Sequence, residues 1–141
     1  MAIRLKFEHL DAVKKHAESA YPYECCGLLL GLLVDGEKTL QEIYPAANAR
    51  EAENQHNRYL IPPQAVLEAE KYARSKRLEI IGFYHSHPEA EARPSRFDLD
   101  HAWPFYSYII VSVKDRMAKE LNSFKMADDR AAFDQEPIIT I

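Results

Sequence analysis

The sequence predicts an α/β or α+β layered domain, in which helices flank a mostly antiparallel set of strands. Two observations indicate this class. The segment Phe7–Ala20 carries apolar residues at helical spacing, and a second helix is expected from Pro62-Pro63 to about Lys76, with its apolar residues at mixed spacing. Between and after them lie short β-forming runs that are separated by turn residues. With no repeat or linker in the sequence, we expect residues 1–141 to form one domain of ordinary size.

The N-terminal elements follow from local patterns. Ile3–Leu5 is a possible first strand. The segment Phe7–Ala20 is predicted to be an amphipathic helix that ends at Pro22, with its apolar residues on one face: Leu10, Val13 and Ala17. The apolar run Cys25–Val34 is bounded by a turn signal, which favours a strand, although its length also permits a helix.

A hairpin and a loop are predicted next. Asp35-Gly36 is a hairpin signal, and Lys38–Pro45 would be the returning strand. The polar stretch Asn48–Asn57 indicates a loop, and Arg58–Ile61 a short extended piece. Pro62-Pro63 then fits a helix start, because proline is tolerated in the first turn of a helix.

The C-terminal half alternates between β-forming and helical patterns. A strand is predicted over Glu79–Ser86, and a short helix over Arg96–Ala102 that Pro104 ends. Asp128–Arg130 marks a turn. Three further strands are predicted from β-forming composition: Tyr106–Val113, Met117–Met126 and Pro137–Ile141.

Two histidines at the end of a strand form the strongest chemical signal. Alternate residues of a strand share a face, so His85 and His87 point the same way, with Cα atoms roughly 7 Å apart. Pro88 has no N–H to donate and ends the strand ladder. Ser95-x-x-Asp98 opens the next element, and a carboxylate returning from the turn could supply a third ligand. Three protein ligands with a water describe a catalytic zinc site.

A structural alternative exists for each of these residues. Ser95-x-x-Asp98 also fits the helix capping signature, in which Ser95 caps the helix and Asp98 complements the helix dipole. The two interpretations compete for the Asp98 carboxylate. His101 shares a helix face with Asp98 and is either a partner of the ligands or a rival ligand. Glu89 and Glu91 are expected to contact substrate or water.

Composition and charge restrict the class of protein. A net charge of −4 without a basic cluster argues against a nucleic-acid partner. The sequence shows neither a secretory signal nor a long apolar span, so a reducing cytoplasm is expected and no membrane partner. The only cysteines, Cys25 and Cys26, are adjacent; buried small thiols are favoured over a vicinal disulfide or a metal site.

The motif His85-x-His87-Pro88, with seven residues between His87 and Ser95, and Ser95-x-x-Asp98 resembles the JAMM (MPN-plus) metalloprotease signature. The resemblance includes the upstream Glu24 and extends over most of the chain. It implies a three-layer α/β/α fold like that of the cytidine deaminases, with a mixed, mostly antiparallel sheet. It also implies a zinc ion, Zn2+, held by His85, His87 and Asp98.

The same resemblance implies the catalytic roles. Glu24 would transfer protons, and Ser95 would stabilise the oxyanion of the tetrahedral intermediate. Glu24 precedes an apolar run, where partial exclusion from water would raise the pKa of its carboxyl group and suit a general base. The alternative is an ordinary exposed glutamate. An acyl-enzyme role for Ser95 is not expected.

The substrate expectation also comes from this resemblance. The short chain leaves little room for insertions that grip ubiquitin, so it resembles small prokaryotic members of the family. These act after the C-terminal Gly-Gly of ubiquitin-like sulfur-carrier proteins. The alternatives are a non-catalytic MPN scaffold or interaction module, a RadC-like domain, and a nonspecific peptidase. The particular carrier, the leaving group and the oligomeric state are not predicted.

Overall fold

The computed structural model describes residues 2–48 and 61–141. The loop predicted over residues 49–57 and the extended piece over 58–60 lie outside this part. The elements in chain order are β1 (Ile3–Leu5), α1 (Phe7–Ala20), β2 (Cys26–Val34), β3 (Glu37–Ala46), α2 (Pro63–Ser75), β4 (Glu79–Pro88), α3 (Arg96–His101), β5 (Ser107–Lys114), β6 (Met117–Met126), β7 (Phe133–Glu136) and β8 (Ile138–Thr140).

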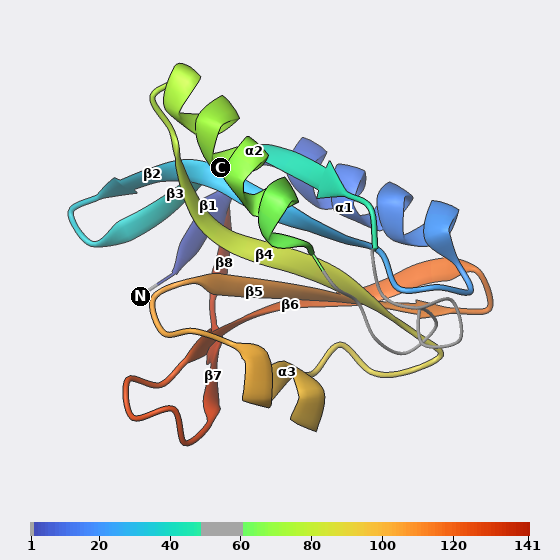
Figure 1. Cartoon of the computed structure of the whole chain (residues 1–141). Coiled ribbons are helices and arrows are strands. Elements are labelled where there is room, and N and C mark those ends of the chain that lie inside the picture. Colours follow the sequence, from blue (N-terminus) through green and yellow to red (C-terminus); the bar gives the residue numbers. More distant parts are fainter. Residues whose placement is uncertain (1, 49–60) are drawn as a thin grey trace.

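In the described part of the chain, eight strands form one mixed sheet in the order β7-β6-β5-β4-β2-β3-β1-β8. The pairs β2–β3, β2–β4, β5–β6 and β6–β7 are antiparallel, whereas β4–β5, β1–β3 and β1–β8 are parallel. Helix α1 covers one face of the sheet, and α2 and α3 lie on the other (Figure 1). The predicted three-layer α/β/α arrangement with a mostly antiparallel sheet is therefore confirmed.

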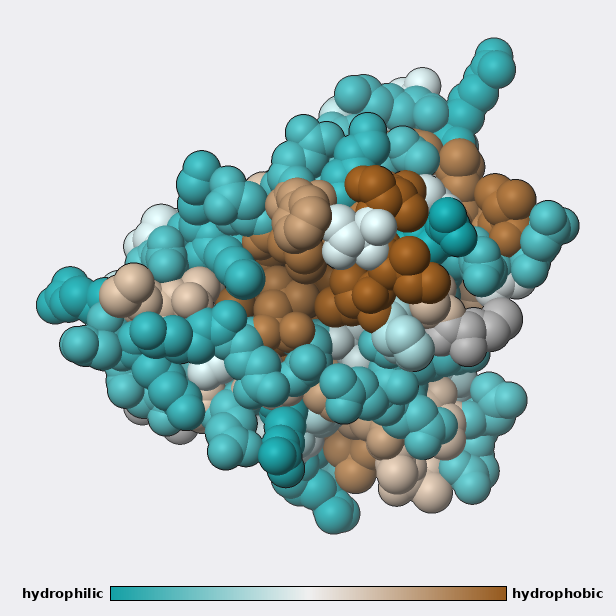
Figure 2. Space-filling view, turned by 180° about the vertical axis from the view of Figure 1, so that it is seen from behind, coloured by the Kyte–Doolittle hydropathy of each residue, from teal (hydrophilic) through white to brown (hydrophobic). Residues whose placement is uncertain are grey.

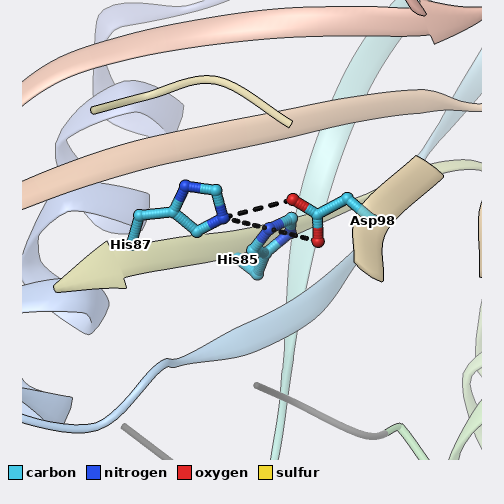
Figure 3. Close-up of side chains that lie close together, drawn as sticks. All are labelled: His85, His87 and Asp98. Atoms are coloured by element: carbon cyan, nitrogen blue, oxygen red, sulfur yellow. Dashed lines mark hydrogen bonds and ion pairs between the residues drawn. The ribbon is translucent and has the colours of Figure 1, made fainter. Parts of the chain in front are cut away.

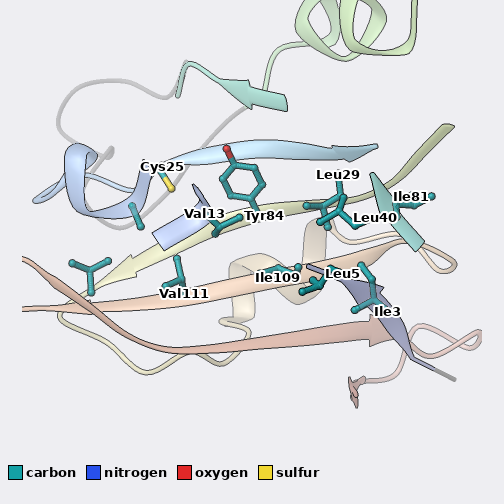
Figure 4. Packing of buried hydrophobic residues seen from close by; sticks show 12 residues of the cluster. Ile3, Leu5, Val13, Cys25, Leu29, Leu40, Ile81, Tyr84, Ile109 and Val111 are labelled. Carbon is teal, nitrogen blue, oxygen red and sulfur yellow. The ribbon is translucent and has the colours of Figure 1, made fainter. Parts of the chain in front are cut away.

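The core divides into two sides because successive strand residues point to opposite faces. On the α1 side, Val13 and Ala17 of the helix pack with Leu29, Tyr84 and other buried residues (Figure 4). On the α2 side, the helix contributes two alanines to a cluster with alternate residues of β2: Ala69, Ala73, Leu28 and Leu30. The small alanines let α2 lie close to the strands that carry the site.

A buried ionic group joins the edge strand β7 to β3, which lies inside the sheet. Lys38 Nζ of β3 lies 3.7 Å from Glu136 Oε2 at the end of β7, and both side chains are almost fully buried. Ser107 Oγ and Ser123 Oγ donate to Glu136 Oε1 at 2.6 and 2.8 Å. These hydrogen bonds satisfy the buried carboxylate, which would otherwise be costly.

Most predicted elements agree with the structure within one or two residues. The apolar run after Cys25 is a strand and not a helix, and β4 continues to Pro88, so that both histidines lie within it. The prediction missed β7, because Phe133–Glu136 is short and carries two acidic residues. The predicted C-terminal strand is shorter than expected, at Ile138–Thr140.

The surface behind the view of Figure 1 is hydrophilic around a central hydrophobic area (Figure 2). Several large apolar side chains are more than half exposed: Phe7, Val34, Trp103, Met117 and Ile141. Within the described ranges, each helix is too short or too polar to cross a lipid bilayer.

Candidate active site with a metal centre

Strand β4 and the first turn of α3 bring His85, His87 and Asp98 together (Figure 3). The two histidine Nε2 atoms lie 3.1 Å apart. His85 Nε2 is 3.2 Å from Asp98 Oδ1, and His87 Nε2 is 3.2 Å from Asp98 Oδ2. All three residues are buried. The structure thus brings the three predicted side chains together, and their role as metal ligands stays a prediction.

A backbone carbonyl orients the ring of His87. His87 Nδ1 lies 3.0 Å from the carbonyl oxygen of Glu91, which can only accept a hydrogen bond. In the neutral ring the proton then sits on Nδ1, and the lone pair of Nε2 faces Asp98. This arrangement is typical of a metal-binding histidine, whose other nitrogen donates to a carbonyl or carboxylate.

The donor set fits a divalent metal ion. Three groups with acceptor character face one another at 3.1–3.2 Å, which is unfavourable unless a cation or shared protons lie between them. Tetrahedral zinc with bonds of about 2.0–2.1 Å separates its ligand atoms by roughly 3.3 Å. His85, His87 and Asp98 thus have the chemistry and spacing of a three-ligand zinc site.

The three groups differ in their protonation preferences, and the Asp98 carboxylate accounts for much of the difference. Burial lowers the pKa of His85, which favours its neutral, metal-binding form. Burial opposes a charge on His87, but the hydrogen bond and the charge of Asp98, together with the Glu91 carbonyl, outweigh burial and raise the pKa of that ring. Burial also opposes the charge on Asp98, yet the neighbouring imidazoles and the Ser95 N–H hold the pKa of the carboxyl group well below its ordinary range. Asp98 is therefore a carboxylate.

Ser95 and Asp98 form a capping box at the start of α3. Ser95 Oγ accepts from the Asp98 backbone N–H, with 3.1 Å between the heavy atoms, and the Ser95 N–H donates to Asp98 Oδ2 at 2.8 Å. Helix capping and metal binding were expected to compete for the Asp98 carboxylate. They do not compete, because its two oxygens accept from the Ser95 N–H and face the histidines at the same time. Ser95 itself is exposed, so its hydroxyl proton can reach a bound molecule.

Glu24 lies buried two residues before β2, with 5% of its surface exposed. The alternative of an ordinary exposed glutamate is therefore wrong. In the antiparallel β2–β4 pair Cys26 lies opposite His85, and the Ser86 N–H donates to the Cys25 carbonyl at 3.2 Å. Continued by two pairs, through Cys25 and Ser86, this register puts Glu24 opposite His87 on the same sheet face.

An apolar cleft opens beside the metal ligands. Its volume is about 300 Å³, and both His85 and Asp98 contribute to its wall. Aromatic side chains form much of the rest, among them Phe97, Trp103 and Phe133. Of the dense aromatic segment after α3, Tyr108 is buried and also lines the cleft, whereas Trp103 is 64% exposed.

The structure gives protein partners to three residues near the site, and Glu89 and Glu91 are exposed to water. Glu89, expected to contact substrate or water, accepts hydrogen bonds from Tyr21 Oη and the Asp115 N–H, at 2.8 and 2.7 Å. The Glu91 side chain pairs with Arg93. His101 is exposed and directs Nδ1 to the Phe97 carbonyl at 2.8 Å, so it does not join the ligand group.

The adjacent cysteines are buried free thiols, as favoured by their sequence context. Burial raises the pKa of Cys25 to about 11 and that of Cys26 to about 12. Both therefore stay protonated near neutral pH, which makes them poor nucleophiles and poor metal ligands.

Sequence reasoning missed three contacts around the site. The Glu91 carbonyl orients His87, and no side-chain pattern signals a backbone acceptor. Asn48 and Ser86 contact the peptide group that follows Glu24. For Ser86 a signal existed, because a residue between two histidines on a strand must point to the opposite sheet face.

Comparisons with known proteins agree with this architecture. Residues 7–127 match the family Prok-JAB, described as prokaryotic homologs of the JAB domain. The desampylase of Haloferax volcanii is 33% identical over 113 residues, covering 76% of this chain and 78% of the relative. The CysO-cysteine peptidase of Mycobacterium bovis is 29% identical over 135 residues, covering 95% and 88%.

A solved structure supports the fold independently of close sequence similarity. A JAB1/MPN domain protein from Archaeoglobus fulgidus superposes with a TM-score of 0.58 at 20% identity and covers 99% of both chains. The family match spans most of this chain and includes both histidines, Ser95 and Asp98. The chain therefore belongs to the prokaryotic branch of the JAB (JAMM/MPN-plus) domain family.

Proposed function

We propose that this protein is a zinc-dependent peptidase that hydrolyses the amide bond after the C-terminal Gly-Gly of a ubiquitin-like sulfur-carrier protein. The observation that carries the proposal is the convergence of His85, His87 and Asp98 next to the buried Glu24. A scaffold has no need for this combination, because three buried acceptor groups that face one another destabilise a fold without a ligand.

In this proposal His85, His87 and Asp98 hold Zn2+, and their remaining contacts keep them in place. When bound, zinc would polarise the scissile carbonyl group and lower the pKa of a water molecule to about 7. Glu24 accepts a proton from the water molecule, and the oxygen of that water attacks the carbonyl carbon. Glu24 then gives that proton to the leaving amine as the C–N bond breaks.

Ser95 stabilises the oxyanion in this scheme. Its Oγ accepts from the Asp98 N–H, and a hydroxyl can accept and donate at once. The hydroxyl proton is therefore available to the developing negative charge, and the capping bond holds the oxygen in position. A positioned donor of this kind contributes about 3–4 kcal/mol in other hydrolases.

The substrate class is supported by the names of two relatives, a desampylase and a CysO-cysteine peptidase. A chain end with two glycines has no side chains that would keep the carbonyl group away from the site. It can approach buried ligands more closely than other sequences can. A cytoplasmic location and a single domain over residues 1–141 belong to the same proposal; the buried free thiols are compatible with a reducing compartment.

A panel of carrier conjugates tests the substrate assignment. Replacing either terminal glycine with a bulkier residue should lower kcat/KM far more than changing the residue after the bond. A carbonyl group misplaced by about 1 Å can cost on the order of a hundredfold in rate. The Gly-Gly tail would be excluded as the determinant of specificity if glycine replacements were tolerated while changes to the leaving group abolished cleavage. A nonspecific peptidase would cleave unrelated peptides at similar rates.

A further inference from the structure

The peptide group between Glu24 and Cys25 is held from both sides. Its carbonyl oxygen, on Glu24, accepts a hydrogen bond from Asn48 Nδ2 at 3.1 Å. Its N–H, on Cys25, donates to Ser86 Oγ at 2.8 Å. The peptide plane next to the proposed catalytic carboxylate is thus held by two side chains. Ser86 belongs to β4, and Asn48 follows the end of β3.

Ser86 connects this peptide group directly to the metal ligands. It lies between His85 and His87 on β4, and its side chain is fully buried on the opposite sheet face. The Ser86 N–H also donates to the Cys25 carbonyl at 3.2 Å. Ser86 and Cys25 are therefore joined in both directions, so the position of Cys25 follows that of the histidines.

Asn48 approaches the same peptide group from the other neighbouring strand. It lies two residues after the end of β3, which pairs with β2 through Cys26 and Ala46. Its amide donates to the Glu24 carbonyl, whereas Ser86 accepts from the Cys25 N–H. The two bonds act on opposite ends of the peptide plane and together oppose its rotation.

Rotation of this plane changes the ψ angle of Glu24, which sets how its backbone and side chain are oriented relative to β2 and β4. We propose that Asn48 and Ser86 are positioning residues that hold the Glu24 carboxylate in register with the metal centre. This inference rests on the proposed function, because it assumes that Glu24 transfers protons during hydrolysis. Neither residue touches the substrate; both act through the Glu24–Cys25 peptide group.

The kinetic test compares Asn48→Ala and Ser86→Ala with a matched control. Ser123→Ala removes an equally buried hydroxyl, on β6, that donates to Glu136. Both positioning variants should lose about ten- to a hundredfold in kcat, the effect of a displacement near 1 Å. KM and zinc content should stay close to those of the wild type, and Ser123→Ala should retain kcat. Unchanged kcat in Asn48→Ala, or an equal loss in Ser123→Ala, would overturn the proposal.

A readout without turnover tests the contact itself. Amide hydrogen exchange at Cys25 should become faster in Ser86→Ala, because its N–H loses a buried acceptor, and should not change in Ser123→Ala. If Ser86→Ala does not fold, Asn48→Ala decides the question, because Asn48 is only half-buried and its loss should perturb the fold less. Cys25 exchange that is unaffected by loss of the Ser86 hydroxyl contradicts the inference.

A double-mutant cycle with Glu24→Gln separates positioning from general destabilisation. Once the carboxylate is absent, Asn48→Ala should cost less than about twofold further, because there is no proton acceptor left to position. If Asn48→Ala lowers the rate of Glu24→Gln as strongly as it lowers the rate of the wild type, Asn48 has a structural role instead. Failure of the proposed function looks different: the wild type would not cleave, or Glu24→Gln would cleave as fast as the wild type.

Discussion

The carboxylate of Asp98 lies 2.8 Å from the backbone nitrogen of Ser95, and the Ser95 hydroxyl oxygen lies 3.1 Å from the backbone nitrogen of Asp98. The same carboxylate faces the Nε2 atoms of His85 and His87. A carboxylate has about four lone-pair sites on two oxygens, so these contacts do not exclude one another. The helix start therefore fixes the orientation of a metal ligand.

Ser95→Ala should impair both stability and turnover. Loss of the cap costs about 0.5–2 kcal/mol of folding stability, and loss of an oxyanion donor costs about 10²–10³ in kcat. Ser95→Thr keeps a hydroxyl and serves as the matched control; it should retain most of both. Thermal unfolding and steady-state kinetics measure the two effects separately. A variant with alanine that loses stability but keeps full kcat would leave Ser95 with capping alone.

His87→Ala should abolish stoichiometric zinc binding, because two remaining ligands cannot form a three-ligand site. His101→Ala is the control, since His101 is exposed and bonds the Phe97 carbonyl. Elemental analysis of the purified proteins should find close to one zinc per chain in the wild type and in His101→Ala. Equal zinc in His87→Ala would remove His87 from the ligand set.

Glu24→Gln should keep zinc and the fold but lose nearly all turnover. Glutamine has a similar shape to glutamate but accepts no proton near neutral pH, so metal content and activity should separate. Elemental analysis and single-turnover cleavage of the same preparation make the comparison. If Glu24→Gln loses zinc as readily as His85→Ala, then Glu24 is a ligand and its proposed role is wrong.

Lys38→Met should be one of the more destabilising substitutions outside the site. It leaves the buried Glu136 carboxylate without its cation, and breaking a buried ion pair costs roughly 3–5 kcal/mol. Lys15→Met removes an exposed pair with Asp11 and should barely move the denaturation midpoint. Adding Glu136→Leu to Lys38→Met should recover part of the loss. Equal midpoints for the two single variants would show that the buried pair does not stabilise the sheet.

Local patterns predicted the elements but not their arrangement. Helix α1 matches its predicted bounds, because one apolar stripe and a following proline define it. The parallel β4–β5 pairing could not be predicted, since strand composition carries no direction. The position of β7 depends on Glu136 meeting Lys38 from a strand about a hundred residues earlier, a long-range contact without a local signal.

The site was predictable to the extent that its residues share a strand or a helix turn. His85 and His87 lie two residues apart on β4, and Asp98 lies three residues after Ser95 in the first turn of α3. Burial of Glu24 depends on the pairing of β2 with β4, which the sequence does not encode locally. The same is true of the contacts that Asn48 and Ser86 make with its peptide group.

The most direct test of the account is the intact mass of the products formed from a carrier whose C-terminal Gly-Gly is joined by an amide to a second amino acid or peptide. We expect the wild type to release a carrier that ends at Gly-Gly, with one water added across the bond. Chelation of zinc should stop the reaction, and restored zinc should resume it. An uncleaved conjugate in the presence of zinc, or cleavage at the same rate by Glu24→Gln, would contradict the account.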